Sequence, residues 1–178
     1  MELKGNARRY GTIAIALHWV SALGILVMLA SGIAMGQGLL GSPAPGAIIL
    51  SHATLGILIL LLTVLRLVWW LAFDRRPEPV AGIPAWQKRL AMAVHGLLYV
   101  TIFVAASSGL GTLILSGAVP SILAGNPAPE FTGMGPYITH GLTGRLLLLL
   151  LVMHIGAALY HHFVRRDRLL GRMGIGNV

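Results

Sequence analysis

The residues of this sequence that could do chemistry are its seven histidines, because several of them lie in strongly apolar segments. Four of them occur in residues 138–163, which read ITHGLTGRLLLLLLVMHIGAALYHHF. Ionisable residues inside a membrane segment are costly and are functional candidates by default. Imidazole is a common metal ligand, and it also exchanges protons near neutral pH. The histidines are therefore candidates for metal binding or proton transfer.

The composition is that of a membrane protein. The chain has 178 residues, of which 56% are hydrophobic and only 10% are charged, whereas soluble domains carry about 25% charged residues. Its length predicts one domain, residues 1–178. There is no cysteine, which excludes disulfides, thiolate metal sites, iron–sulfur clusters and the cysteine attachment of c-type haem.

Four segments are long and apolar enough to cross a membrane, which takes about 20 apolar residues. They are residues 12–35, 50–73, 90–116 and 137–164. The first is too long for a signal peptide and is interpreted as a retained helix. The connections at 36–49 and 117–136 are rich in Gly and Pro and are predicted to be turns and loops. The predicted fold is an all-α transmembrane four-helix bundle.

The basic residues predict the orientation of this bundle. Eleven of the thirteen Lys and Arg residues would lie on one side of the membrane: Lys4, Arg8, Arg9, Arg75, Arg76, Lys88, Arg89, Arg165, Arg166, Arg168 and Arg172. The positive-inside rule places that side, with both termini, in the cytoplasm. The net charge of +8 is then explained by the membrane topology, and it also favours contact with anionic lipid. Nucleic acid is not a predicted partner.

Helix direction gives each histidine a depth. His52 and His140 open their helices near the outer surface, whereas His18, His95 and His154 lie in the inner half. The fourteen residues from His140 to His154 rise about 21 Å and return to within about 40° of the same helix face. One helix could therefore offer one ligand to each of two stacked metal centres. His18 and His95 compete to be the partner of His154.

The residue four positions after each histidine shares its helix face, and its size separates the candidates. It is small in four cases, which would leave room for a flat haem: Ala22, Gly56, Gly144 and Ala158. It is large in the other three: Tyr99, Arg165 and Arg166. Small residues also serve close helix packing in membranes. The predicted ligands are the histidines that precede small residues: His18, His52, His140 and His154.

Two other roles are possible for these histidines. Each could simply hydrogen-bond a neighbouring helix, and the protein would then be a haem-free structural protein. Structural zinc is the other alternative, but it requires four ligands at one point, which two separated layers do not supply. A site with two histidines and no nearby carboxylate suits b-type haem with imidazole on both axial positions, an arrangement that serves electron transfer.

Four sequence stretches resemble the bacterial cytochrome b561 family. They are ALHW at 16–19, SHATLGILILLLTVLRL at 51–67, VHGLLY at 94–99 and HIGAALYHHFVRRDRLL at 154–170. The resemblance runs from about Arg9 to Leu170. It implies a multi-pass protein of the bacterial inner membrane with two b haems that reacts with ubiquinone. It also implies an outer haem between His52 and His140 and an inner haem between His18 and His154.

The resemblance implies two kinds of activity. One is oxidation of superoxide at the outer face with transfer of the electrons to ubiquinone, which would make the chain a superoxide oxidase. The other is service as an electron-transfer subunit docked to a larger redox enzyme or respiratory complex. The outer connections, 36–49 and 117–136, contain no Lys or Arg, so steering of an anion toward the outer haem is not expected from them.

Further residues are candidates for contact with haem or quinone. Arg66 lies fourteen residues after His52, which places it on the inner half of the same face. It is expected to pair with a propionate of the inner haem, unless it reaches the lipid headgroups. The candidates for quinone contact or proton transfer are His95, Tyr99, His161 and His162. The alternatives are a helix–helix hydrogen bond for His95 and interfacial solvation for His161 and His162.

Overall fold

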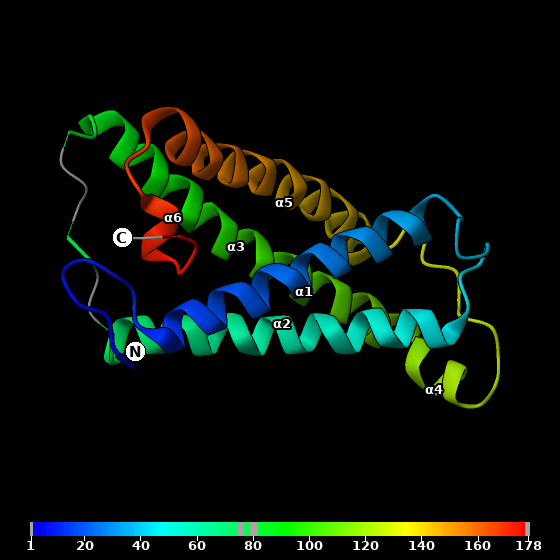
Figure 1. Ribbon diagram of the computed structural model, residues 1–178. Helices are drawn as coiled ribbons and strands as arrows, with labels where there is room; N and C mark the ends of the chain where they lie inside the picture. Colours follow the sequence, from blue (N-terminus) through cyan, green and yellow to red (C-terminus); the bar gives the residue numbers. More distant parts are fainter. Residues whose placement is uncertain (1, 75–76, 79–81, 177–178) are drawn as a thin grey trace. The chain divides into compact units, whose positions relative to one another are not determined.

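The computed structural model describes residues 2–74, 77–78 and 82–176, and within them the chain is helical and has no strands. The elements (Figure 1) are α1 Thr12–Gly36, α2 Gly46–Ala72, α3 Ala85–Ser116, α4 Ala118–Leu123, α5 Gly135–Leu159, the π-helix η1 Tyr160–Arg165, and α6 Leu169–Arg172. Arg75 and Arg76, which support the predicted orientation, lie outside the described residues.

Four helical segments are long and apolar enough to cross a membrane: Thr12–Gly36, Gly46–Ala72, Ala85–Ser116 and Gly135–Arg165. The predicted all-α fold with four spans is thus confirmed. α2 and α3 begin earlier than predicted, at Gly46 and Ala85. In both cases a proline precedes the helix, and its carbonyl oxygen accepts a first-turn hydrogen bond, from Ile49 to Pro45 and from Lys88 to Pro84. Proline suits this position because it lacks an N–H that the first turn would leave unpaired.

Two predicted details are wrong. The connection at 117–136 was predicted to be turns and loops, but it contains the short helix α4. This helix starts directly after Gly117, whose backbone is in the left-handed conformation (φ 65°). Ala118 in α4 is fully buried, so burial stabilises this short helix. The fourth span is not α-helical throughout, because it becomes the π-helix η1 from Tyr160. π-turns of this kind occur frequently at functional sites.

The long helices expose apolar side chains around their circumference. Leu61, Leu71 and Leu115 are 59%, 70% and 70% exposed. Among the described residues, no large side chain is completely buried. A helix that is apolar all round belongs inside a protein core or a membrane, and the protein itself does not cover these surfaces. The lipid bilayer is therefore the environment that they fit.

The chain divides into two compact units, and each long helix contributes a segment to both. The first unit comprises Met1–Ala22, Leu62–Leu98 and Leu149–Val178, and the second comprises Leu23–Leu61 and Tyr99–Leu148. His18, His95 and His154 belong to the first unit, and His52 and His140 to the second. The histidines that were assigned to different depths thus belong to different units.

The terminal segments of the first unit are tied to its helices. The backbone N–H of Gly5 donates to Asp74 Oδ1 at 2.6 Å, and the indole N–H of Trp19 donates to the carbonyl oxygen of Met173 at 2.9 Å. The backbone N–H of Tyr10 donates to the Arg172 carbonyl oxygen at 3.3 Å.

Candidate functional site: the histidine pairs

The second unit brings His52 of α2 and His140 of α5 together. Their ring centroids are 6.1 Å apart. A metal–imidazole bond is about 2 Å long, so two imidazoles on opposite sides of one ion have facing nitrogens about 4 Å apart and ring centres roughly 6 Å apart. The predicted outer pair therefore has the separation that two axial ligands of one iron require.

Hydrogen bonds hold one nitrogen of each ring in the outer pair. His140 Nδ1 lies 2.8 Å from the carbonyl oxygen of Ala105, and His52 Nδ1 lies 2.8 Å from Ser31 Oγ. Because a carbonyl oxygen can only accept, His140 carries its hydrogen on Nδ1 and has its lone pair on Nε2. Metal-ligating histidines commonly donate their other ring N–H to such a partner, so the outer pair has the hydrogen bonding of a ligand pair.

Two glycines allow neighbouring helices to approach the outer pair. A Cβ atom at Gly109 of α3 would lie 2.9 Å from His140 Nδ1 and 3.0 Å from its Cε1. A Cβ atom at Gly32 of α1 would lie 3.4 Å from His52 Cε1. Gly144, predicted to leave room beside His140, would have no neighbour within 4 Å of an added Cβ. The side chain of His140 is thus in close contact with α3, while the helix surface at Gly144 stays open.

In the first unit, His154 of α5 lies close to two histidines. Its ring centroid is 6.3 Å from that of His18 and 5.1 Å from that of His95. His95 Nδ1 lies 2.6 Å from the carbonyl oxygen of Ala91 in its own helix. His18 Nδ1 is buried without a hydrogen-bond partner. Buried nitrogens are rarely unpaired, so His18 is the histidine whose bonding a bound group would complete.

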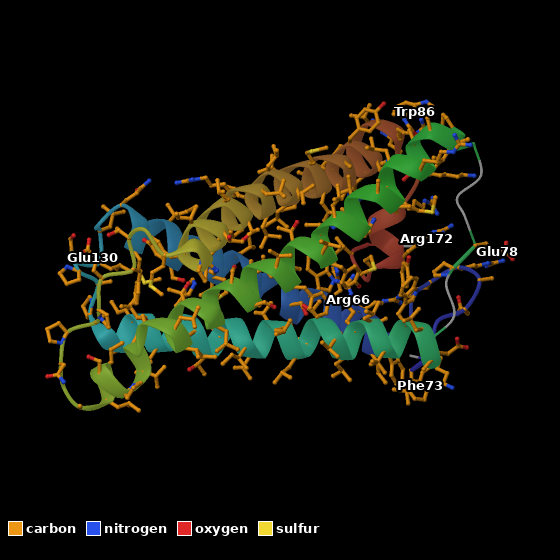
Figure 2. All side chains as sticks on the ribbon, turned by 180° about the vertical axis from the view of Figure 1, so that it is seen from behind. Arg66, Phe73, Glu78, Trp86, Glu130 and Arg172 are labelled. Carbon is orange, nitrogen blue, oxygen red and sulfur yellow. The ribbon has the colours of Figure 1, made fainter. Side chains whose placement is uncertain are left out.

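Arg66 belongs to the same unit as His18 and His154. Figure 2 shows its place on α2. The position of Arg66 agrees with the prediction that its positive charge pairs with an anionic propionate group of the inner haem. Tyr99, the other residue proposed to act with His95, belongs to the second unit.

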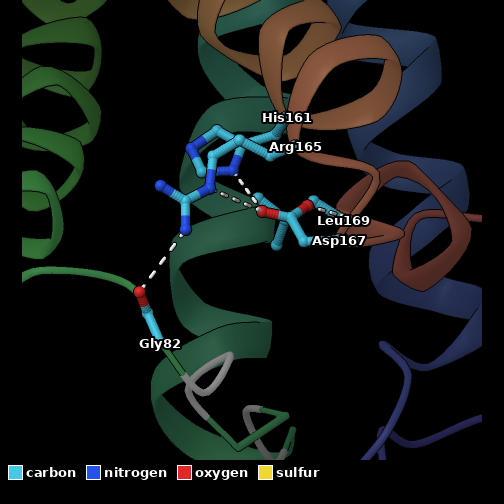
Figure 3. A network of polar contacts seen from close by, with 5 residues as sticks. All are labelled: Gly82, His161, Arg165, Asp167 and Leu169. Carbon is cyan, nitrogen blue, oxygen red and sulfur yellow. Dashed lines mark hydrogen bonds and ion pairs between the residues drawn. The ribbon is translucent and has the colours of Figure 1, made fainter.

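His161 takes part in a polar network at the end of the fourth span (Figure 3). Its Nδ1 hydrogen-bonds the carboxylate of Asp167, and Arg165 Nε lies 4.0 Å from the same carboxylate oxygen. The other oxygen of Asp167 accepts a hydrogen bond from the backbone N–H of Leu169 at 3.3 Å. His162 contacts the ring of Phe163 instead. Of the two neighbouring histidines, His161 alone joins this network.

The arrangement disfavours the zinc alternative. Within residues 2–74, 77–78 and 82–176 there is no group of three or more His, Asp or Glu side chains arranged to hold a metal ion. Structural zinc requires four ligands. A haem requires only two from the protein, because its porphyrin supplies the others, and the histidine pairs match this need.

Apolar spanning helices that hold paired histidines define a membrane cytochrome of the b type. The family model for prokaryotic cytochrome b561 matches residues 9–176, and the chain belongs to this family. It is similar to cytochrome b561 homolog 2 of Escherichia coli K12, with 30% identity over 188 residues, 97% of this chain and 95% of the relative. It is also similar to homolog 1 of the same strain, with 28% identity over 170 residues, 93% of this chain and 96% of the relative. No solved structure matches the chain.

Membership of this family confirms the resemblance found in the sequence. It makes the chain a haem b protein of the bacterial inner membrane that transfers electrons across the membrane. The four spanning helices agree with the multi-pass location.

Sequence reasoning missed several residues around the outer pair. Ser31 and the Ala105 carbonyl group contact the histidines from helices distant in sequence, and no spacing rule connects them. Gly109 of α3 approaches His140 closely, and the sequence alone does not connect these two residues. A single sequence offered no signal for these partners.

We expect Gly109→Ala to displace His140 and weaken haem binding. The added methyl group would lie 2.9 Å from Nδ1, so the ring must move away from its hydrogen bond to Ala105. Loss of such a supporting contact typically costs 10–100-fold in metal affinity. Haem content per purified chain, measured by absorption, should fall.

Gly111→Ala is the matched control on the same helix. A Cβ atom at Gly111 would make only ordinary contact, 3.7 Å from Pro136. We expect this variant to keep its haem. If Gly109→Ala retains the full haem content and its spectrum, the close approach of α3 does not position His140.

Proposed function

We propose that the chain holds two b haems, an outer one between His52 and His140 and an inner one between His18 and His154. The observation that carries this proposal is the near-equal separation of the two pairs, 6.1 and 6.3 Å, in two different units. The choice of His18 over His95 rests on the residue four positions later, which is the small Ala22 after His18 and the bulky Tyr99 after His95.

The haem group supplies reversible one-electron oxidation and reduction. A haem held by two histidines would have no open site for oxygen and would serve electron transfer. Arg66 would compensate a propionate charge that is costly inside the membrane. His95, close to His154 but bonded to its own helix, is free at Nε2 to contact a second molecule near the inner haem.

Replacing single histidines should remove the haems separately. His52→Ala or His140→Ala should lower the haem content while leaving much of the inner haem, and His18→Ala or His154→Ala should do the reverse. His95→Ala should leave the haem content close to that of the unmodified protein. The measurement is the haem-to-protein ratio with the reduced spectrum. Loss of a haem from the His95 variant, with both retained in the His18 variant, would contradict the inner pairing.

We further propose that the electrons pass from a donor at the outer haem to ubiquinone at the inner side. With superoxide as donor, two superoxide anions release two electrons and become two O₂ molecules. One ubiquinone takes up these two electrons with two protons and becomes ubiquinol. Both protons must reach the quinone, and histidine is suited to relay them near neutral pH.

The His161–Asp167 pair supports a quinone position on the inner side. Asp167 holds the Nδ1 side of the ring, so Nε2 is left to face another molecule. The π-helix places this histidine one turn from the basic end of the span, where Arg165 adds positive charge. His95, Tyr99 and His162 remain the other candidates for quinone contact.

Stopped-flow mixing of the oxidised protein with superoxide would test the donor. We expect haem reduction whose rate depends weakly on ionic strength, because the outer connections at 36–49 and 117–136 carry no Lys or Arg and so provide little electrostatic steering. A steep fall in rate with salt would contradict this picture of the outer surface. Absence of reduction would favour the alternative, an electron-transfer subunit that receives electrons from a docked redox enzyme at this surface, whose connections contain no Lys or Arg.

The second half of the reaction is tested in the same instrument by mixing the reduced protein with ubiquinone. Asp167→Asn should slow reoxidation, because a neutral amide holds the Nδ1 hydrogen of His161 less firmly than the carboxylate does. Glu130→Gln, a carboxylate change in the 117–136 connection, serves as the control. Equal reoxidation rates in all three proteins would place the quinone away from His161.

A further inference from the structure

Ser31 of α1 makes two hydrogen-bond contacts through one hydroxyl oxygen. Ser31 Oγ lies 3.0 Å from the carbonyl oxygen of Met28, one turn earlier in the helix. It also lies 2.8 Å from His52 Nδ1, on α2. The next residue, Gly32, allows this approach, since a Cβ atom there would lie 3.4 Å from His52 Cε1.

The two contacts together fix the direction of both hydrogen bonds. A serine hydroxyl has one hydrogen to donate and lone pairs that accept. The Met28 carbonyl oxygen can only accept, so the contact is a bond only if Ser31 donates to it. His52 Nδ1 must then donate its own hydrogen to Ser31 Oγ. If His52 Nδ1 accepted instead, it would compete with the Met28 carbonyl oxygen for the single hydroxyl hydrogen of Ser31. One of the two hydrogen bonds would then be lost.

This direction sets the tautomer of His52. With the hydrogen on Nδ1, the lone pair lies on Nε2, which is then the nitrogen that could bind an iron. A hydrogen bond donated by a ligating imidazole also raises its basicity. A more electron-donating ligand stabilises oxidised iron, and hydrogen bonding near the iron is one of the means by which a protein sets the potential of a haem.

We propose that Ser31 is a positioning residue for the outer haem, which holds His52 in the ligating tautomer and lowers the reduction potential of that centre. This inference rests on the proposed assignment of His52 and His140 as a haem-binding pair. His140 has the corresponding hydrogen bond to a backbone carbonyl group, at Ala105, which side-chain substitution does not remove. Ser31 is therefore the side chain through which the ligand hydrogen bonding of the outer pair can be changed.

The test is a spectroelectrochemical titration of the haem-loaded protein and four variants. Ser31→Ala removes the hydroxyl, and Ser31→Thr keeps it. Ser51→Ala is the matched control, because Ser51 is exposed and donates only to Ala47 in its own helix. The outer centre is identified as the one that His140→Ala removes.

We expect Ser31→Ala to retain two haems and to raise the midpoint potential of the outer centre alone. The shift should correspond to about a fivefold change in the reduction equilibrium, the net contribution of about one hydrogen bond. Ser31→Thr should restore the original potential, and Ser51→Ala should not change it. Loss of the outer haem from Ser31→Ala with recovery in Ser31→Thr would also support the role of the hydroxyl.

Unchanged midpoint potentials in Ser31→Ala would overturn the inference, as would loss of the outer haem in both Ser31 variants, because then the hydroxyl does not matter. These results are distinct from failure of the proposed function. If the proposed function failed, the unmodified protein would lack an outer haem. His140→Ala would then contain as much haem as the unmodified protein.

Discussion

The structure depends on the need to satisfy polar groups inside a membrane. Hydrocarbon offers no hydrogen bonds, so each imidazole nitrogen must find a partner in the protein or in a bound group. In the outer pair, Ser31 and the Ala105 carbonyl group bond one nitrogen of each ring. In the proposed haem site the remaining nitrogens would bind the iron, and this would explain why histidines can persist in such apolar helices.

The apolar helices meet the same need in a second way. Threonine and serine hydroxyls donate to carbonyl groups of their own helix, as Thr54 does to Leu50 and Thr143 does to Thr139. Glycines then bring one helix close to another without adding apolar bulk, as at Gly109 beside His140. Hydroxyl groups on exposed parts of the helices are thus bonded to the backbone of their own helix, as at Thr54.

The sequence predicted the parts of this arrangement that follow from the period of the α-helix and from the length of the apolar segments. Four spans are recognisable because about 20 apolar residues are needed, and the outer pairing of His52 with His140 followed from helix direction alone. The contacts of Ser31 and Gly109 could not be predicted, because they depend on which helices are neighbours. α4 and η1 were also missed. Their stability depends on burial of Ala118 and on the contact of His161 with Asp167, neither of which a hydropathy pattern contains. The ring centroid of His95 lies nearer to that of His154 than the ring centroid of His18 does, at 5.1 Å against 6.3 Å, so proximity did not decide the inner pair.

The claim at the centre of this account is that each chain binds two haems, each between two histidines. The most direct measurement is a pyridine haemochrome assay of the purified protein combined with low-temperature electron paramagnetic resonance of its oxidised form. The account predicts two b haems per chain, both low-spin with two imidazole ligands. A single haem per chain, or a high-spin iron with an open axial position, would contradict it.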